Sequence, residues 1–178
     1  MLNIHSCYSL RYGTVTPEQL VSWIETASYN RVALTDINNT SALLGYIRLM
    51  QQQKLIPIVG IDFRNGINCC YVGIAKNNDG FMELNQFLSE HLHHGKEFPT
   101  QAPAFQNCYI IYPWGKNESQ LKQNERIGIT AHQLNKLQAH QPDNWANYVA
   151  LQPMTFLDKS QFNTHRLLRA IDCNTLLS

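Results

Sequence analysis

Two stretches of sequence decide the fold: Asn3-Ile4-His5-Ser6-Cys7-Tyr8-Ser9-Leu10 opens the chain, and Leu34-Thr35-Asp36-Ile37-Asn38 follows the first predicted helix. Each carries polar side chains directly after a short apolar run, where a β-strand is expected to end. Asp62 lies near the end of a third apolar run. Because sites in α/β folds are built at the carboxyl ends of strands, we expect His5, Asp36 and Asp62 to lie close together.

Strands and helices alternate along the chain. Apolar runs predict strands at 1–4, 31–34, 56–63, 67–74, 108–112, 126–129 and 148–151, with a hairpin turn at Asn65-Gly66. Helical periodicity and capping signals predict helices that start near Thr16 and Thr130, and others at about 40–53, 79–91 and 159–170. About seven strands, mostly separated by helices, predict a parallel or barrel-like α/β fold.

Composition narrows the function classes. The chain has 178 residues, of which 44% are hydrophobic and 15% charged, as expected of a globular domain with a core. Its net charge is +1 and its basic residues are not clustered, so this piece alone is not expected to bind the phosphate backbone of a nucleic acid strongly. No apolar run is long enough to span a membrane, and no secretory signal is apparent. Five cysteines without a repeated spacing predict free thiols and a cytoplasmic location.

The chemistry-bearing residues are few. A multinuclear metal phosphoesterase needs several His and carboxylate ligands, and His5, Asp36 and Asp62 are too few for such a cluster, although one ion could bind weakly. The structural interpretation, which we favour, has Asp36 capping the following helix and His5 hydrogen-bonded to Asp36 or Asp62. The remaining candidates are the histidines of a helix end and an adjacent cysteine pair, for which we expect no metal and no redox role: His91, His93, His94, Cys69 and Cys70.

Residues 3–13 resemble the opening motif of the PHP (polymerase and histidinol phosphatase) domain of bacterial DNA polymerase III alpha subunits, which usually reads His-x-His-Ser-x-Tyr-Ser. Further segments resemble, in order, its Thr-Asp-His, Lys-Pro-Ile-x-Gly-x-Glu-Phe and Leu-Ala-Lys-Asn-x-x-Gly-Tyr motifs and the helix after its last Asp-x-His-Tyr motif: 33–39, 56–63, 74–81 and 165–171. The resemblance implies a distorted (βα)7-type barrel with shortened elements in the second half. It also implies that 1–178 is a single PHP-like domain, the N-terminal fragment of a longer polymerase chain.

The departures from the family pattern fall on its metal ligands. Asn3 stands where the family has its first His, Tyr12 replaces an Asp, Ile37 replaces a His, and Asp62 shortens a Glu. The last Asp-x-His pair falls on two residues that supply neither a carboxylate nor an imidazole. The vestigial metal-site positions are therefore Asn3, His5, Tyr12, Asp36, Ile37, Asp62, Pro153 and Thr155. The resemblance thus implies a degenerate metal site, with no catalytic residue and no metal or other cofactor expected in this domain.

The parent of such a domain resembles a DNA-directed DNA polymerase, a nucleotidyltransferase of DNA replication whose polymerase carboxylates lie far downstream. We therefore expect a non-catalytic structural or scaffolding domain. Its expected partners are the remainder of the alpha subunit and a proofreading exonuclease subunit, with DNA reached only through the full-length parent and no membrane contact. One alternative is a metal-dependent phosphoesterase or 3′–5′ exonuclease that uses Zn, Mn or Mg on His5, Asp36 and Asp62. Another is a free-standing interaction protein with a PHP fold.

Overall fold

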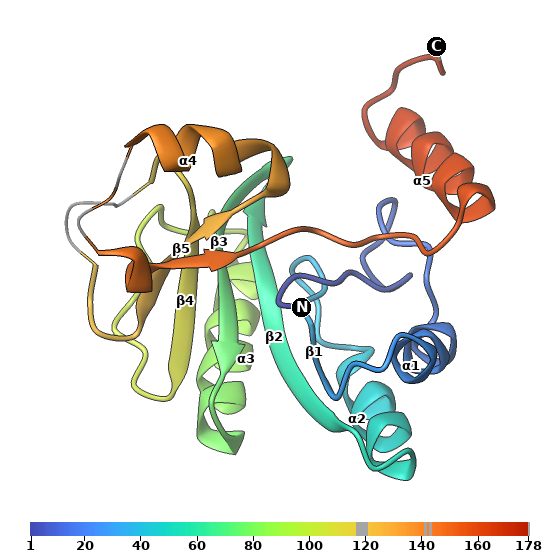
Figure 1. The fold of residues 1–178 in the computed structure, drawn as a ribbon, viewed down its shortest axis with the longest axis horizontal. Helices are drawn as coiled ribbons and strands as arrows, with labels where there is room; N and C mark the ends of the chain where they lie inside the picture. Colours follow the sequence, from blue (N-terminus) through green and yellow to red (C-terminus); the bar gives the residue numbers. More distant parts are fainter. Residues whose placement is uncertain (117–120, 141, 143, 178) are drawn as a thin grey trace.

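A curled six-stranded sheet forms the centre of the computed structural model, which describes residues 1–116, 121–140, 142 and 144–177 (Figure 1). In the described residues the strands follow one another in sequence order: β1 (Arg31–Leu34), β2 (Ile56–Asn65), β3 (Asn68–Ala75), β4 (Cys108–Pro113), β5 (Glu125–Ile129) and β6 (Tyr148–Ala150). The pairs β1/β2, β4/β5 and β5/β6 are parallel. The pairs β2/β3 and β3/β4 are antiparallel, so the expected parallel order holds only for part of the sheet.

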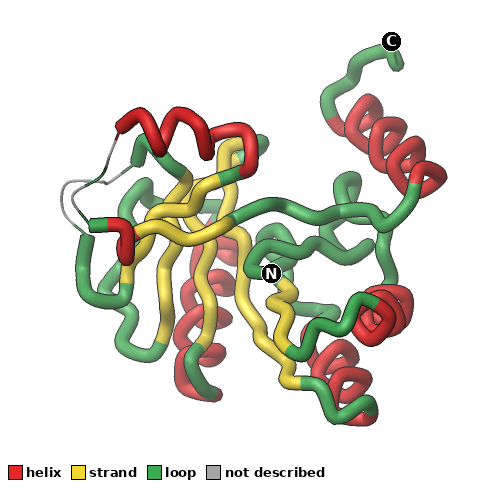
Figure 2. Tube along the Cα trace, viewed as in Figure 1, coloured by secondary structure: helices red, strands yellow, loops and turns green. Residues whose placement is uncertain are grey.

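The helices, drawn red in Figure 2, are α1 (Pro17–Thr26), α2 (Leu43–Gln52), α3 (Asn78–His94), α4 (Leu134–His140) and α5 (Lys159–Asp172). Helix α3 packs on β2, β3 and β4, while α2 packs on β2 and α1 packs on α2. The capping box predicted at Thr16 and Gln19 is present and starts α1. At Thr130 the predicted capping box starts a 3-10 turn, Ala131–Gln133, which leads into α4.

Three clusters of buried apolar side chains hold the layers together. One joins α3 to the sheet through residues such as Phe63 and Leu84, and a second joins α1 and α2 to β1. The third links Ala33 of β1 with Val72 and Ile111 of the middle strands and with Leu151 after β6. Because Ala33 and Leu151 belong to opposite ends of the sheet, the sheet curls around this third cluster.

The N-terminal segment runs between the two ends of the curled sheet. Ile4 forms isolated parallel bridges with Leu34 at the end of β1 and with Met154 in the segment that follows β6. Backbone hydrogen bonds reach both sides, from the Thr35 amide to the Ile4 carbonyl (2.8 Å) and from the His5 amide to the Met154 carbonyl (2.9 Å). The strand predicted at 1–4 is therefore wrong as a continuous strand, and the sheet has six strands in the described residues where the sequence predicted about seven.

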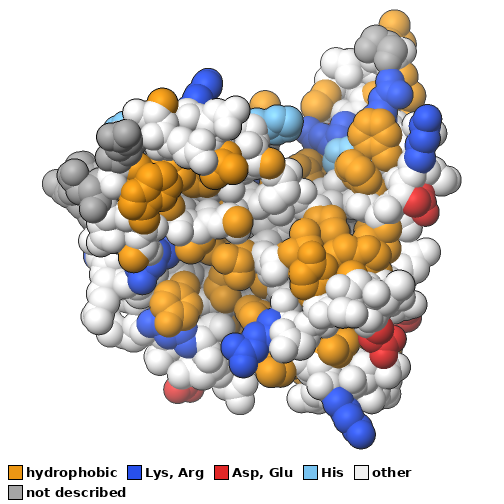
Figure 3. Space-filling view, in the orientation of Figure 1, with side chains coloured by type: hydrophobic (Ala, Val, Ile, Leu, Met, Phe, Trp, Pro, Cys, Tyr) orange, Lys and Arg blue, Asp and Glu red, His pale blue; other side chains and the backbone are white. Residues whose placement is uncertain are grey.

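Helix α5 stands apart from this body (Figure 1), and none of its described residues is buried. Leu167 and Ile171 on it, and Leu176 beyond it, are exposed. Figure 3 shows hydrophobic and basic side chains together over α5. None of the helices in the described ranges is long and apolar enough to cross a membrane.

Candidate functional site

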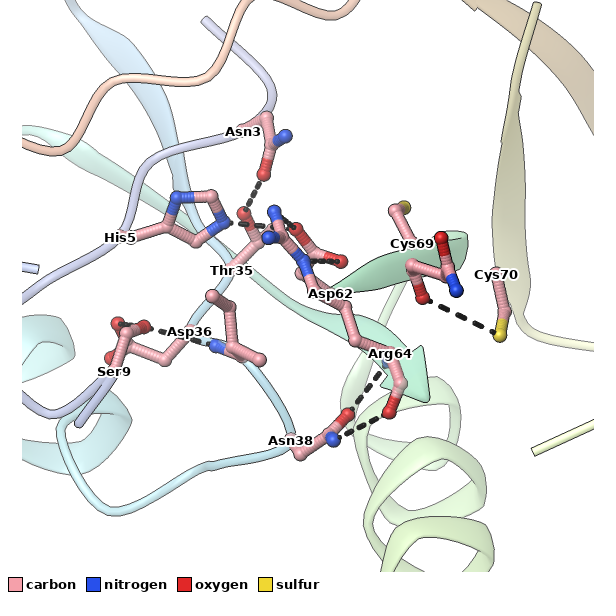
Figure 4. A network of polar contacts seen from close by, with 12 residues as sticks. Asn3, His5, Ser9, Thr35, Asp36, Asn38, Asp62, Arg64, Cys69 and Cys70 are labelled. Carbon is pink, nitrogen blue, oxygen red and sulfur yellow. Dashed lines mark hydrogen bonds and ion pairs between the residues drawn. The ribbon is translucent and has the colours of Figure 1, made fainter. Parts of the chain in front are cut away.

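Two of the predicted strand-end residues meet in the interior of the fold. The His5 Nε2 atom lies 3.0 Å from Asp62 Oδ2, and both side chains are fully buried (Figure 4). Because an ionised carboxylate only accepts hydrogen bonds, Nε2 donates in this pair. The other ring nitrogen, Nδ1, is buried and has no hydrogen-bond partner among the described residues. The predicted pairing of His5 with a nearby carboxylate is confirmed, and the partner is Asp62.

Arg64 forms an ion pair with the same carboxylate. It lies two residues beyond Asp62 on β2 and donates from Nε to Oδ1 at 3.1 Å and from Nη2 to Oδ2 at 2.7 Å. This two-point geometry is the strong form of an Arg–carboxylate pair, and only 11% of the Arg64 side chain is exposed. Arg64 was not among the site residues predicted from the sequence. The local signal was a cation two residues after a carboxylate that was predicted to end a strand. Regular alternation would place these two side chains on one face, but the strand is irregular between Phe63 and Arg64.

These contacts set the ionisation of Asp62. Burial alone would raise the pKa of its carboxyl, but the hydrogen bonds and charges of His5 and Arg64 outweigh burial and lower the pKa from 3.8 to about 2. A carboxyl whose pKa is lower in the folded state than in the unfolded state stabilises the fold above the unfolded pKa. That contribution is lost as the pH falls from about 4 towards 2.

We therefore expect Asp62→Asn to make the free energy of unfolding less dependent on pH in the acid range. The wild-type free energy of unfolding should lose on the order of 2 kcal/mol from this group between about pH 4 and pH 2, and the variant should lack that part of the slope. Urea unfolding followed by circular dichroism at stepped pH measures the difference. Asp79→Asn, at an exposed carboxylate, is the control and should keep the wild-type slope. The same pH dependence of the unfolding free energy in wild type and Asp62→Asn would contradict the lowered pKa of Asp62.

Asp36 is held by the opening loop instead of by a cation. Its Oδ1 accepts from the Ser6 amide (2.6 Å) and the Ser9 hydroxyl (2.7 Å), and its Oδ2 accepts from the Ser6 hydroxyl (2.7 Å). Burial raises the pKa of Asp36 and outweighs the opposing effect of these hydrogen bonds. The predicted capping role of Asp36 is wrong, because α2 begins at Leu43 after Ala42, which forms no side-chain cap.

The other predicted positions make contacts elsewhere or are exposed. Asn3 is buried and its side-chain oxygen accepts from the Thr35 hydroxyl at 3.0 Å. The Ile37 backbone amide donates to the Ser9 hydroxyl at 3.0 Å. Thr155 is buried, and its backbone carbonyl accepts from both the amide and the hydroxyl of Thr14. Pro153 is exposed.

Tyr12 covers the outer side of the cluster formed by His5, Asp62 and Arg64. Its ring meets the His5 ring edge-on at a centroid distance of 5.2 Å and the His165 ring of α5 at 5.1 Å. The Arg64 guanidinium carbon lies 4.8 Å from the ring centroid, and that of Arg169 lies 5.2 Å from it. The Tyr12 carbonyl also contacts His165 Nδ1 at 2.6 Å. The ring thus links helix α5 to the cluster.

The donor set does not fit a divalent metal ion. Both oxygens of Asp62 accept from a guanidinium, which is a permanent cation and would repel an ion at the same place. Both oxygens of Asp36 accept from donors of the opening loop. The Ile37 side chain has no donor atom to offer. In the part of the chain that the structure describes, no group of three His, Cys, Asp or Glu side chains is placed to hold an ion.

The secondary candidates lie elsewhere or in unreactive surroundings. The three histidines occupy the last turn of α3, as predicted. Cys69 is partly buried beside Asp62, and burial together with the Asp62 charge raises the pKa of its thiol. Cys70 is buried. A hollow of about 730 Å³ lies around Ile56 and Tyr109, near the start of β2 and away from the Asp62 end of that strand.

Comparisons with known proteins agree with these motifs. The family model described as the PHP domain matches residues 2–147. The DNA polymerase III subunit alpha of Ureaplasma parvum serovar 3 (strain ATCC 700970) is 28% identical over 159 residues, which are 89% of this chain and 15% of that protein. The chain therefore spans only about 15% of the length of this curated relative.

A crystal structure of a candidate metal-dependent phosphoesterase from Bifidobacterium adolescentis ATCC 15703 is also similar, with a TM-score of 0.40 and 9% identity. The match covers 97% of this chain and 84% of the other, and at this similarity it carries no information on function. The family model, in contrast, matches most of the sequence, and the matched range includes His5, Asp36 and Asp62. The chain belongs to the PHP domain family.

Proposed function

We propose that this chain is the PHP domain of a DNA polymerase III alpha subunit and acts there as a non-catalytic structural domain in cytoplasmic DNA replication. The similarity to the Ureaplasma subunit over 89% of the chain supports the proposal that the domain is part of an alpha subunit. One observation carries the non-catalytic role: every oxygen of Asp36 and Asp62 accepts a hydrogen bond from the chain itself. A metal would have to displace those donors before it could activate water.

Residues 1–178 form one domain in the N-terminal part of a longer polymerase chain. It packs on the remainder of the alpha subunit and on a proofreading exonuclease subunit, and it reaches DNA only through the full-length parent. Exposed apolar side chains on and after α5 support a packing role. In this proposal residues 1–5 take the place of the seventh strand of a (βα)7-type barrel, since they hydrogen-bond to both ends of the sheet.

The experiment measures metal content and nuclease activity on the same sample. After incubation with manganese or zinc and gel filtration, elemental analysis should find well under one ion per chain. A 3′–5′ exonuclease assay on labelled single-stranded DNA should give the same background for wild type and His5→Ala. A chelator should leave the melting temperature unchanged, because no metal binding is linked to folding. One ion per chain together with activity that His5→Ala abolishes would overturn the proposal.

A further inference from the structure

A buried carboxylate without a countercharge is costly, so the cation that pairs with Asp62 determines whether this cluster is stable. Asp62 and His5 are fully buried, and both lie within the range that the family model matches. In an enzyme with metal at such a place, the ion itself neutralises the carboxylate. In this chain the guanidinium of Arg64 takes that position against both Asp62 oxygens.

We infer that the Arg64 guanidinium is the resident cation of this cluster, in exchange for a metal ion, and that the cluster accepts a divalent ion only when this guanidinium is removed. The inference rests on the proposed loss of metal binding and adds its cause. The missing ligands limit the cluster to a single weakly held ion, and the internal cation excludes that ion.

The backbone around Arg64 is built to hold the guanidinium in place. Asn38, two residues after Asp36, accepts from the Arg64 amide at 2.9 Å and donates to the Arg64 carbonyl at 2.8 Å. The pairing of β2 with β3 shifts register between Phe63 and Arg64, so Arg64 lies at an irregularity of the strand. Asn38 itself has a positive φ of 47°, a conformation that Asn tolerates better than most residues. The loop after β1 therefore fixes the Arg64 backbone by a two-point clamp.

One of the departures from the family motif also fits a guanidinium better than a metal. Tyr12 stands where the family pattern has a carboxylate, and its ring lies 4.8 Å from the Arg64 guanidinium carbon. Aromatic faces attract guanidinium groups and offer no ligand to a divalent ion. Arg64, Asn38 and Tyr12 thus form one consistent arrangement around Asp62.

The test removes the guanidinium and asks whether manganese replaces it. The variants are Arg64→Ala and Arg64→Gln, the second of which keeps most of the side-chain stem, and the double variant Asp62→Asn with Arg64→Ala. Arg48→Ala, at an exposed arginine of α2, is the matched control. Melting temperatures are measured by circular dichroism in a chelator and in excess manganese chloride, and manganese binding is measured by calorimetry.

In chelator, we expect Arg64→Ala to melt at least about 5 °C below wild type, because Asp62 is left buried with its charge partner removed. Manganese should restore at least half of that loss in Arg64→Ala and Arg64→Gln, with about one ion bound per chain. It should leave wild type and Arg48→Ala unchanged. The double variant should not respond either, because it no longer carries the Asp62 charge.

Absence of a manganese response in both single variants would overturn the inference, and so would failure of both to refold even in manganese. In either case a metal-free wild type would still support the proposed function. A manganese response of wild type equal to that of Arg64→Ala would overturn both, since the cluster would then take an ion with the guanidinium in place.

Discussion

Gly13→Ala should leave the chain largely unfolded under conditions in which the wild type is folded. A Cβ atom at position 13 would lie 1.8 Å from the carbonyl oxygen of Ser6 and 2.5 Å from its carbonyl carbon. Both are backbone atoms, so no side-chain rotation relieves the contact. The loop would have to open, although it is closed by the Cys7 amide on the Val15 carbonyl and by the Gly13 amide on the Ser9 carbonyl. Opening it also pulls Ser6 and Ser9 away from Asp36.

We expect the loss to exceed about 4 kcal/mol, in the range that only severe steric or buried-polar defects reach. Urea unfolding followed by circular dichroism measures it. Gly45→Ala is the matched control, because Gly45 is exposed within α2 and a Cβ there meets nothing within 4 Å. That substitution should be neutral or stabilise by about 0.5–1 kcal/mol through helix propensity. A Gly13→Ala protein within about 1 kcal/mol of wild type would contradict the tight approach of residues 6 and 13.

Asp36→Ala should cost about 3–5 kcal/mol of unfolding free energy. The substitution removes the acceptor of three buried donors, the Ser6 amide and the hydroxyls of Ser6 and Ser9, and leaves a void at a fully buried position. Each unsatisfied buried donor costs about 1–3 kcal/mol, although the hydroxyls can turn to other partners. The loss of the loop contacts should also loosen the Ile37 amide, which donates to Ser9.

Asp36→Asn separates the hydrogen bonds from the charge. It keeps the volume and one carbonyl acceptor, and burial already opposes ionisation of Asp36 by raising its pKa. We therefore expect a smaller loss, about 1–2 kcal/mol. Both losses should be the same with manganese or with a chelator, since Asp36 acts as an acceptor for the loop. Equal losses for the Ala and Asn variants, or a loss that appears only with metal present, would contradict this role.

Local sequence signals predicted the parts of the fold that depend on a few neighbouring residues. The capping box at Thr16 formed because both of its partners lie within one turn. The turn at Asn65-Gly66 formed because Gly66 can adopt its φ of 59° without strain. The strand predicted at 1–4 failed for the opposite reason, because its pairing depends on Met154, about 150 residues away in the sequence.

The candidate site was predictable only in part, again for physical reasons. His5 lies beside Asp62 as expected, although isolated bridges of Ile4 hold the opening segment there in place of the predicted strand. The direction of the Asp36 carboxylate depends on how the opening loop folds back over it, which no spacing encodes. The role of Arg64 depends on a strand irregularity and on the Asn38 clamp, and both are tertiary features.

The double bridge of Ile4 sets an order on the assembly of this domain. Residues 3–5 are synthesised before Met154 and can complete their hydrogen bonds only after it has been made, since His5 and Asn3 bond to Met154 directly. Such long-range closure slows folding, because the chain entropy of the loop is lost before the contact is gained. We therefore expect the opening motif to stay unpaired on its Met154 side while the other strands form. Its pairing with Met154 should be among the last contacts of the domain to form.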